Sequence, residues 1–433
     1  MKTVTHRIPG LVLTDHVFTV PLDHARSGKR GGRTIEVFAR EIVAPAKEKQ
    51  NLPWLVFFQG GPGFGSPRPG ESSGWIKRAI QDYRVLLLDD RGTGRSTPVT
   101  SQTLAHLKSP RAMADYLKHF RADSIVRDAE LIRRQLLGKN EKWTLLGQSY
   151  GGWCIFNYLS AAPQAVREAI VTGGIPSITR PAEDIYRASY PRVREKTRLY
   201  FERFPNDEKV AHEIAAYLAA NKVTLPAGGR LSVRRFQQLG MELGMSDGAA
   251  KIHFMLEDAF VEVAGKREIN FNFLRSFENS QSFDTNPIFA ILHEAIYGQG
   301  AATGWAAQRV RAEFPDFDYS PGKPFIFTGE MIYPWMFDDY AGLKPLKEAA
   351  DLLAEYEDWP MLYRLDVLRK NTVPIAAATY YDDMYVDRQQ SEETARQVPG
   401  IKLWITSQYQ HNALRADGEK LLGRLLGMLH GEI

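Results

Sequence analysis

The chain has 433 residues and a formal net charge of +4, with 44% hydrophobic and 24% charged residues. Its many aromatic residues exclude a largely disordered chain. Basic residues alternate with acidic ones and form no stripe, so we expect no nucleic-acid partner. Cys154 is the only cysteine, which excludes an internal disulfide and a four-cysteine zinc site. A reducing compartment fits this composition, and we expect the cytoplasm.

The sequence also indicates no membrane partner. Its first 18 residues hold no apolar run of signal-peptide length. Elsewhere no stretch approaches the roughly 20 apolar residues that span a bilayer.

Strand and helix patterns alternate along the first part of the chain. Residues 16–21 and 34–42 alternate in polarity around the basic, Gly-rich stretch 27–33, which predicts an antiparallel hairpin. A helix with Asp123 or Ser124 at its N-cap is predicted by apolar residues spaced three and four apart between Ile125 and Leu136. Short apolar runs predict buried parallel strands at residues 54–58, 85–88, 143–146 and 169–172.

The pattern changes after residue 176 and returns near the C-terminus. Residues 177–350 are rich in helix formers and aromatic residues, and the stretches 256–265 and 286–300 predict amphipathic helices. Strands are expected again at 373–379 and 401–406, followed by a helix at 421–431. We therefore expect an α/β fold, a mostly parallel sheet with helices on both faces. Residues 1–176 and 351–433 would form this core, and residues 177–350 a helical cap.

The strongest chemical signal is the stretch GQSYGG at residues 147–152, between a predicted strand and a predicted helix. This is the G-x-S-x-G arrangement of a nucleophile elbow, in which a strained turn lifts the serine oxygen above the sheet edge. Flanking residues must be small because their backbones crowd the neighbouring strand and helix. The alternative is an incidental serine in a Gly-rich turn, but the flanking elements favour Ser149 as a nucleophile.

A second Gly-rich loop, QGGPGFG at residues 59–65, follows the strand at 54–58. Hydrolases with a nucleophile elbow complete their oxyanion hole with a backbone N–H from such a loop. We expect the N–H groups of Gly61 and Tyr150 in that role, with Gly60 as the alternative to Gly61. The charged turn at residues 88–96 lacks the lysine of a phosphate-binding loop, so we expect it to brace the oxyanion loop.

A catalytic triad also needs an acid and a histidine further along the chain. His411 lies just beyond the last predicted strand. The acid should follow the strand before it, where Asp382, Asp383 and Asp387 are candidates.

Together these motifs resemble the prolyl aminopeptidases, also called proline iminopeptidases, serine peptidases of the α/β-hydrolase fold. That family carries H-G-G-P-G, D-x-R-G-x-G-x-S and G-x-S-x-G-G in order, and this chain reads QGGPG, DDRGTGRS and GQSYGG. The stretches HVFTVPLDH, LHEAIYGQG and TGEMIYPWMF resemble its longer, bacterial branch. Gln59 replaces the usual histidine, a change that leaves the backbone oxyanion contact intact.

The resemblance implies release of an N-terminal proline from a small peptide, without metal or cofactor. It favours Asp383 as the acid, because the family's interval to the histidine is close to the 28 positions between Asp383 and His411. The positively charged substrate N-terminus would need carboxylates, for which we expect Glu294 and then Glu330. The alternative hypotheses are an esterase on the same fold and a non-catalytic binding relative. The sequence leaves the oligomeric state open.

Overall fold

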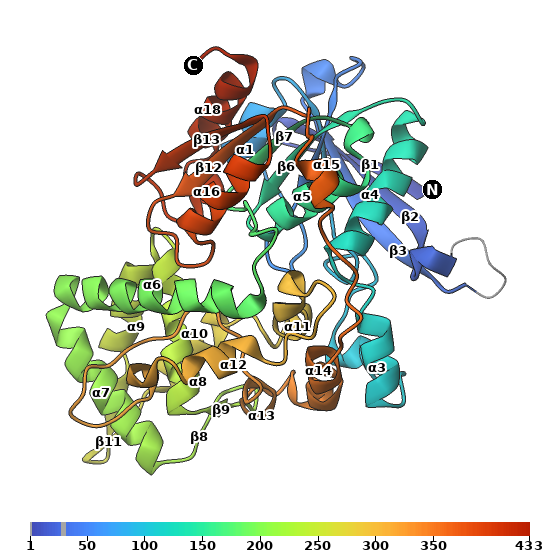
Figure 1. The fold of residues 1–433 in the computed structure, drawn as a ribbon. Coiled ribbons are helices and arrows are strands. Elements are labelled where there is room, and N and C mark those ends of the chain that lie inside the picture. Colours follow the sequence, from blue (N-terminus) through green and yellow to red (C-terminus); the bar gives the residue numbers. More distant parts are fainter. Residues whose placement is uncertain (1, 27–31) are drawn as a thin grey trace.

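The computed structural model describes residues 2–26 and 32–433. Its centre is one large sheet (Figure 1). The nine strands of this sheet are β1 (Lys2–Ile8), β2 (Leu11–Pro21), β3 (Thr34–Val43), β4 (Trp54–Phe58), β5 (Arg84–Leu88), β6 (Trp143–Gln148), β7 (Val166–Thr172), β12 (Ile375–Tyr380) and β13 (Ile401–Thr406). Their spatial order is β1-β2-β3-β5-β4-β6-β7-β12-β13. The pairs from β5 to β13 are parallel and those from β1 to β5 antiparallel, which confirms the predicted mostly parallel α/β fold.

Helices cover both faces of the sheet. Alternate residues of a strand point to opposite faces, so Leu55 and Phe57 of β4 join one apolar core while Val56 and Phe58 join the other. The first core is covered by α1 (Gly74–Ala79), α17 (Ala413–Ala416) and α18 (Gly418–His430). The second is covered by α4 (Ala122–Leu137) and α5 (Tyr150–Ala161), and α16 (Arg388–Gln397) contacts strand β12.

The predicted N-terminal hairpin is present, with β2 pairing antiparallel to β3 from Pro21 opposite Thr34. Most of the predicted turn at 27–33 lies outside the described residues. Strand β1 was not predicted, because its side chains are largely exposed and polar and give no apolar alternation. Helix α4 begins at Ala122 with Arg121 as its N-cap, two positions before the predicted start, so the capping prediction was wrong.

Most of the segment between β7 and β12 lies beyond the sheet, in the lower part of Figure 1, and its last helix returns to pack against α5. Its helices are α6 (Ala182–Arg203), α7 (Pro205–Ala220), α8 (Val233–Gln237), α9 (Gly248–Glu257), α10 (Phe271–Ser280), α11 (Pro287–Ile291), α12 (Ala306–Arg311), α13 (Met336–Asp339), α14 (Lys347–Ala354) and α15 (Leu365–Leu368). Two hairpins accompany them, β8 (Val223–Thr224) with β9 (Arg230–Leu231), and β10 (Phe260–Val263) with β11 (Lys266–Ile269). Two short helices, α2 (Ser101–Leu104) and α3 (Pro110–Leu117), follow β5 and precede α4 in the sequence. Helix α14 of the inserted segment packs against α3.

Two helix predictions in this segment fail in physically clear ways. The stretch 256–265 ends helix α9 and then forms strand β10, whose turn to β11 holds Ala264 and Gly265 at φ of 50° and 75°. A short alternating Val-Glu-Val followed by a residue with positive φ favours a hairpin over a helix. The stretch 286–300 forms only the short α11 and a 3₁₀ turn over Glu294–Tyr297.

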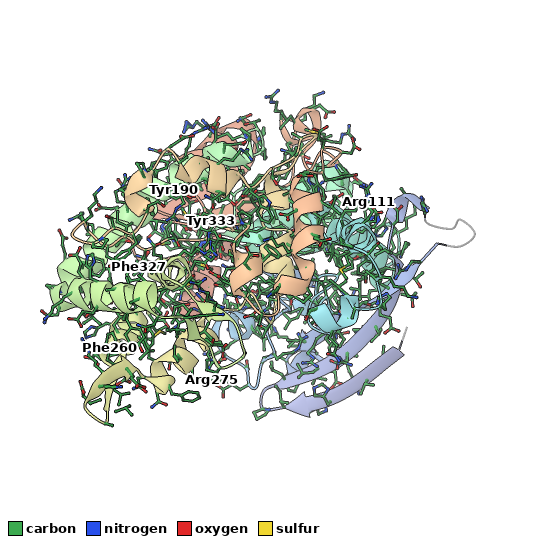
Figure 2. All side chains as sticks on the ribbon, turned by 90° about the horizontal axis from the view of Figure 1, so that it is seen from below. Arg111, Tyr190, Phe260, Arg275, Phe327 and Tyr333 are labelled. Atoms are coloured by element: carbon green, nitrogen blue, oxygen red, sulfur yellow. The ribbon has the colours of Figure 1, made fainter. Side chains whose placement is uncertain are left out.

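Aromatic side chains fill the interior of the inserted segment. Tyr190, Tyr333 and Phe327 are fully buried and lie within it, whereas Phe260 and Arg275 lie toward its rim (Figure 2). The hydroxyls of Tyr190 and Tyr333 are 3.0 Å apart. Within the described residues, no helix is both long enough and apolar enough to cross a bilayer.

Candidate active site

Ser149 follows β6 directly and forms the N-cap of α5, with φ of 54° and ψ of −122°. Such a backbone is strained for any residue but glycine, and it persists only where the surroundings enforce it. The surroundings here are tight. A Cβ on Gly151 would lie 2.1 Å from the carbonyl oxygen of Phe58, and one on Gly152 would lie 1.8 Å from that of Gly174. The strand, turn and helix thus have the geometry of a nucleophile elbow.

His411 and Asp383 form a buried pair, with 2.7 Å between Nδ1 and Oδ2. The other carboxylate oxygen of Asp383 accepts the N–H groups of Tyr385 (2.9 Å) and Val386 (3.2 Å). Although burial disfavours the charged imidazole, the negative charge and hydrogen bond of Asp383 raise the pKa of His411. An imidazole oriented in this way, with Nε2 left for proton exchange, is the arrangement of a general base.

The other two candidate acids lie elsewhere. Asp382 is exposed, on the outer side of the same loop. Asp387 caps α16 and pairs with Arg192 at 2.8 Å. Of the three carboxylates, Asp383 is the one in contact with His411.

A glycine pair after β7 separates the histidine from the serine. A Cβ on Gly173 would lie 3.2 Å from Nδ1 of His411, and one on Gly174 would lie 2.4 Å from the carbonyl oxygen of Ser149. Because carboxyl ends of parallel strands meet at one sheet edge, the loops after β6, β7, β12 and β13 converge here. Ser149, His411 and Asp383 are therefore brought together from distant parts of the sequence.

The Gly-rich loop after β4 passes directly beside the serine. A Cβ on Gly60 would lie 3.1 Å from Cβ of Ser149. Within the described residues, the backbone N–H groups of Gly61 and Tyr150 donate no hydrogen bond, so both are available to an oxyanion. Buried Asp89 holds the end of this loop, accepting the backbone N–H of Ser66 and that of Arg95 at 2.8 Å each.

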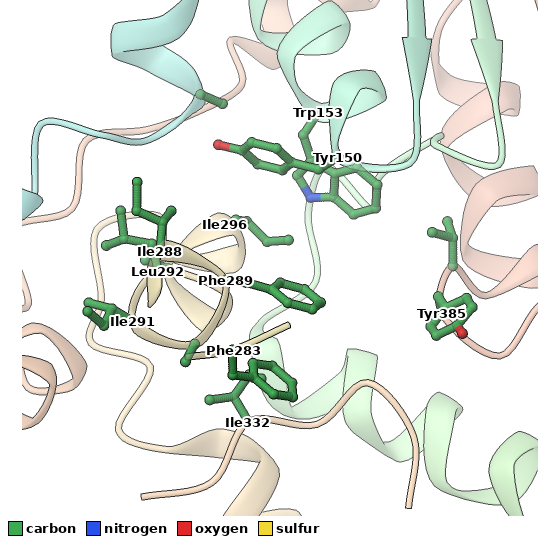
Figure 3. Packing of buried hydrophobic residues seen from close by; sticks show 14 of the residues in the cluster. Tyr150, Trp153, Phe283, Ile288, Phe289, Ile291, Leu292, Ile296, Ile332 and Tyr385 are labelled. Carbon is green, nitrogen blue, oxygen red and sulfur yellow. The ribbon is translucent and has the colours of Figure 1, made fainter. Parts of the chain in front are cut away.

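Aromatic rings from the core and the insertion pack together beside the nucleophile elbow. Figure 3 shows Tyr150 and Trp153 on α5 facing Phe289 of α11, with Tyr385 further along. The ring of Trp153 lies 6.3 Å from that of Tyr297. Such surroundings exclude water and lower the local dielectric, which strengthens any electrostatic contact made there.

Glu330 places a carboxyl group in these surroundings. Burial raises its pKa to about 8, the positive charge of His411 opposes this rise and the negative charge of Asp383 adds to it. His293 lies 4.0 Å away, but burial lowers the pKa of that imidazole to about 3, so it is neutral. The described residues offer Glu330 no hydrogen-bond donor and no permanent cation. A cation entering beside the triad would therefore favour the ionised form of Glu330 and could pair with it.

Glu294 has a different environment. Its two oxygens accept the N–H groups of Ala306 (2.9 Å) and Ala307 (2.8 Å) at the start of α12. Burial raises its pKa to about 7, against these hydrogen bonds. The structure thus brings Glu330 to His411 and Asp383 and fastens Glu294 to a helix end.

Comparison with known proteins places this geometry in a family. A proline iminopeptidase of Aeromonas sobria is 50% identical over 419 residues, covering 97% of this chain and 97% of that protein. The chain belongs to the proline iminopeptidase family. A second proline iminopeptidase, from Aspergillus aculeatus, is 35% identical over 438 residues and covers 99% of this chain and 96% of its own length. The predicted family resemblance is therefore confirmed.

The fold family agrees with the topology of the sheet. The family model for the alpha/beta hydrolase fold matches residues 53–261. A solved proline iminopeptidase from Mycobacterium smegmatis covers 96% of this chain and 98% of its own, with 13% identity and a TM-score of 0.46. The family-model match and the observed strand order confirm the predicted α/β-hydrolase fold.

Two neighbours of the site in this chain were not predicted from its sequence. The ring of Tyr385 packs edge-on against His411 with centroids 4.7 Å apart, and His293 lies beside Glu330. Neither belongs to a short motif, and His293 carries no signal until the chain is folded. Among the described residues, no group of three or more His, Cys, Asp or Glu side chains is arranged to hold a metal ion.

Proposed function

We propose that this chain is a serine aminopeptidase that releases N-terminal proline from small peptides through an acyl-enzyme intermediate. The observation that carries the proposal is Glu330, a carboxyl group only 18% exposed that accepts no hydrogen bond within the described residues and lies beside the His411–Asp383 pair. The 50% identity to a proline iminopeptidase over nearly the whole chain supports the same substrate.

In the proposed reaction, Oγ of Ser149 attacks the carbonyl carbon of the proline residue. His411 takes the serine proton while Asp383 holds the imidazole and stabilises its charged form. The N–H groups of Gly61 and Tyr150 stabilise the oxyanion, each by about 3 kcal/mol in the transition state. His411 then protonates the departing amine, and water attacking the acyl-enzyme releases proline and restores Ser149. Every step uses groups of the chain itself.

Recognition of the substrate N-terminus is assigned to the insertion. The protonated imino nitrogen of proline would pair with ionised Glu330, and the aromatic rings around Phe289 and Trp153 would enclose the pyrrolidine ring. We retain Glu294 as a second carboxylate, acting at longer range because its oxygens are held by α12. This arrangement disfavours a neutral ester, which leaves the carboxylate unpaired.

Two further parts of the proposal concern organisation and setting. We infer a hydrolase core from residues 1–176 and 351–433 and a cap from residues 177–350, supported by the large sheet, whose nine strands all come from the first two ranges. The buried, unpaired thiol of Cys154 fits a reducing compartment such as the cytoplasm.

The test measures hydrolysis of two substrates and covalent labelling of Ser149. Hydrolysis of a proline arylamide should far exceed that of a neutral acyl ester of similar size. The reverse preference would favour an esterase on the same fold. A fluorophosphonate should label Ser149, and a protein that neither reacts nor turns over would be a non-catalytic binding relative.

A further inference from the structure

A cavity of about 380 Å³ is lined by His411 together with residues of the loop after β4. It lies between the loop after β4, the start of α1 and the segment leading into α17. Its size falls in the range of small-ligand pockets, roughly 300–1,000 Å³. The proposed reaction does not yet use it.

The inner end of this cavity carries two side-chain amides. Gln59 precedes the oxyanion glycines and Gln148 precedes the nucleophile, and both line the cavity together with His411. Within the part of the chain that the structure describes, neither side-chain amide makes a hydrogen bond. Gln59, the residue that departs from the family motif, therefore presents a free donor and acceptor next to the reacting groups.

The outer end carries two exposed arginines, of which only one makes an ion pair within the described residues. Arg68 is held by the carboxylate of Asp89. Arg415 is exposed and makes no ion pair within the described residues. The two acids whose charges Arg415 reaches, Glu242 and Asp247, both pair instead with Lys251, at 3.7 and 2.8 Å. The guanidinium of Arg415 thus lines the cavity without a direct ion pair among the described residues.

The walls between these ends are apolar, formed mainly by Phe57, Trp75 and Leu414. An occupant suited to this cavity has an amide near His411, an apolar middle and an anionic end. A short peptide downstream of a cleaved bond has that sequence of groups. His411 protonates the departing amine, so the atoms attached to that nitrogen must lie next to His411.

We propose that this cavity binds the residue or two that follow the proline, and that Arg415 binds the terminal carboxylate of a di- or tripeptide substrate. The inference rests on the proposed function, because only a peptide cleaved at Ser149 sets its downstream part against His411. It makes free short peptides with an apolar second residue the preferred substrates.

The experiment measures kcat/KM for Pro-Leu and Pro-Leu-Gly and for their C-terminal amides. In the wild type the free acids should be preferred over the amides, and Arg415→Gln should lower that acid-to-amide ratio about fivefold, the effect of one exposed charge contact. Arg369→Gln, which removes an exposed arginine outside the cavity, is the matched control and should keep the wild-type ratio.

An unchanged ratio in Arg415→Gln would overturn the assignment of Arg415, and so would an equal fall in the Arg369→Gln control. Failure of the proposed function looks different, because the wild type would then cleave none of these peptides.

Discussion

Replacing Glu330 by glutamine removes a charge while keeping the shape of the side chain. Truncating one partner of a buried ion pair costs about 3–5 kcal/mol. The net contribution of the ion pair is smaller, because Glu330 must first be ionised. Its pKa is about 8, so ionising it at pH 7 costs about 1.4 kcal/mol. The remainder, about 1.6–3.6 kcal/mol, predicts a loss in kcat/KM of roughly 15- to 450-fold for a proline arylamide.

The assay compares this variant with the wild type on a proline arylamide and on a neutral acyl ester at pH 7. Loss on the arylamide alone is expected, because the ester never used the charge. The exposed glutamate of α14 gives the control Glu348→Gln, which should change neither substrate. Equal losses on both substrates would refute the reasoning and make Glu330 a structural residue.

Three further outcomes are expected. Ser149→Ala should keep its thermal unfolding midpoint and lose about 10⁴-fold or more in kcat, and retention of a tenth of the activity would exclude Ser149 as nucleophile. Asp383→Asn should be as damaging in kcat and exposed Asp382→Asn mild, whereas the reverse ranking would move the acid by one residue. Burial raises the pKa of Glu330 from 4.5 to about 8, so its stabilisation is complete below pH 4.5 and is lost as the pH rises through 8. Denaturant titrations should therefore show the unfolding free energy falling between pH 5 and 9 by about 4 kcal/mol more in the wild type than in Glu330→Gln. Parallel curves would contradict the burial of Glu330.

Much of the fold could be predicted because buried parallel strands carry strong local patterns. The runs at 54–58 and 401–406 match β4 and β13 residue for residue. Strand β1 lies at the exposed edge of the sheet, where its side chains do not alternate between water and a core. Its formation depends on pairing with β2, which local sequence does not encode. The hairpin at β10 does carry a local signal, the alternating Val-Glu-Val before Ala264 and Gly265, which the helical interpretation overlooked.

In the candidate site, too, the residues of a local motif could be predicted, and those whose role depends on tertiary packing could not. The elbow around Ser149 is a local backbone device with required glycines, so a six-residue motif is enough to predict it. The contact of His411 with Asp383, rather than Asp382, depends on which way one loop turns after β12. The environments of Glu294 and Glu330 differ still more, since hydrogen bonds to α12 and the neutrality of His293 arise only from tertiary packing.

The central claim is that a free, protonated proline N-terminus is required for cleavage at Ser149. The most direct measurement is kcat/KM of the wild type for a proline arylamide and for its N-acetylated form, side by side at pH 7. The account predicts efficient cleavage of the free form and a loss of about 100-fold or more on acetylation, which removes the charge that Glu330 binds. Equal rates on the two substrates would contradict it.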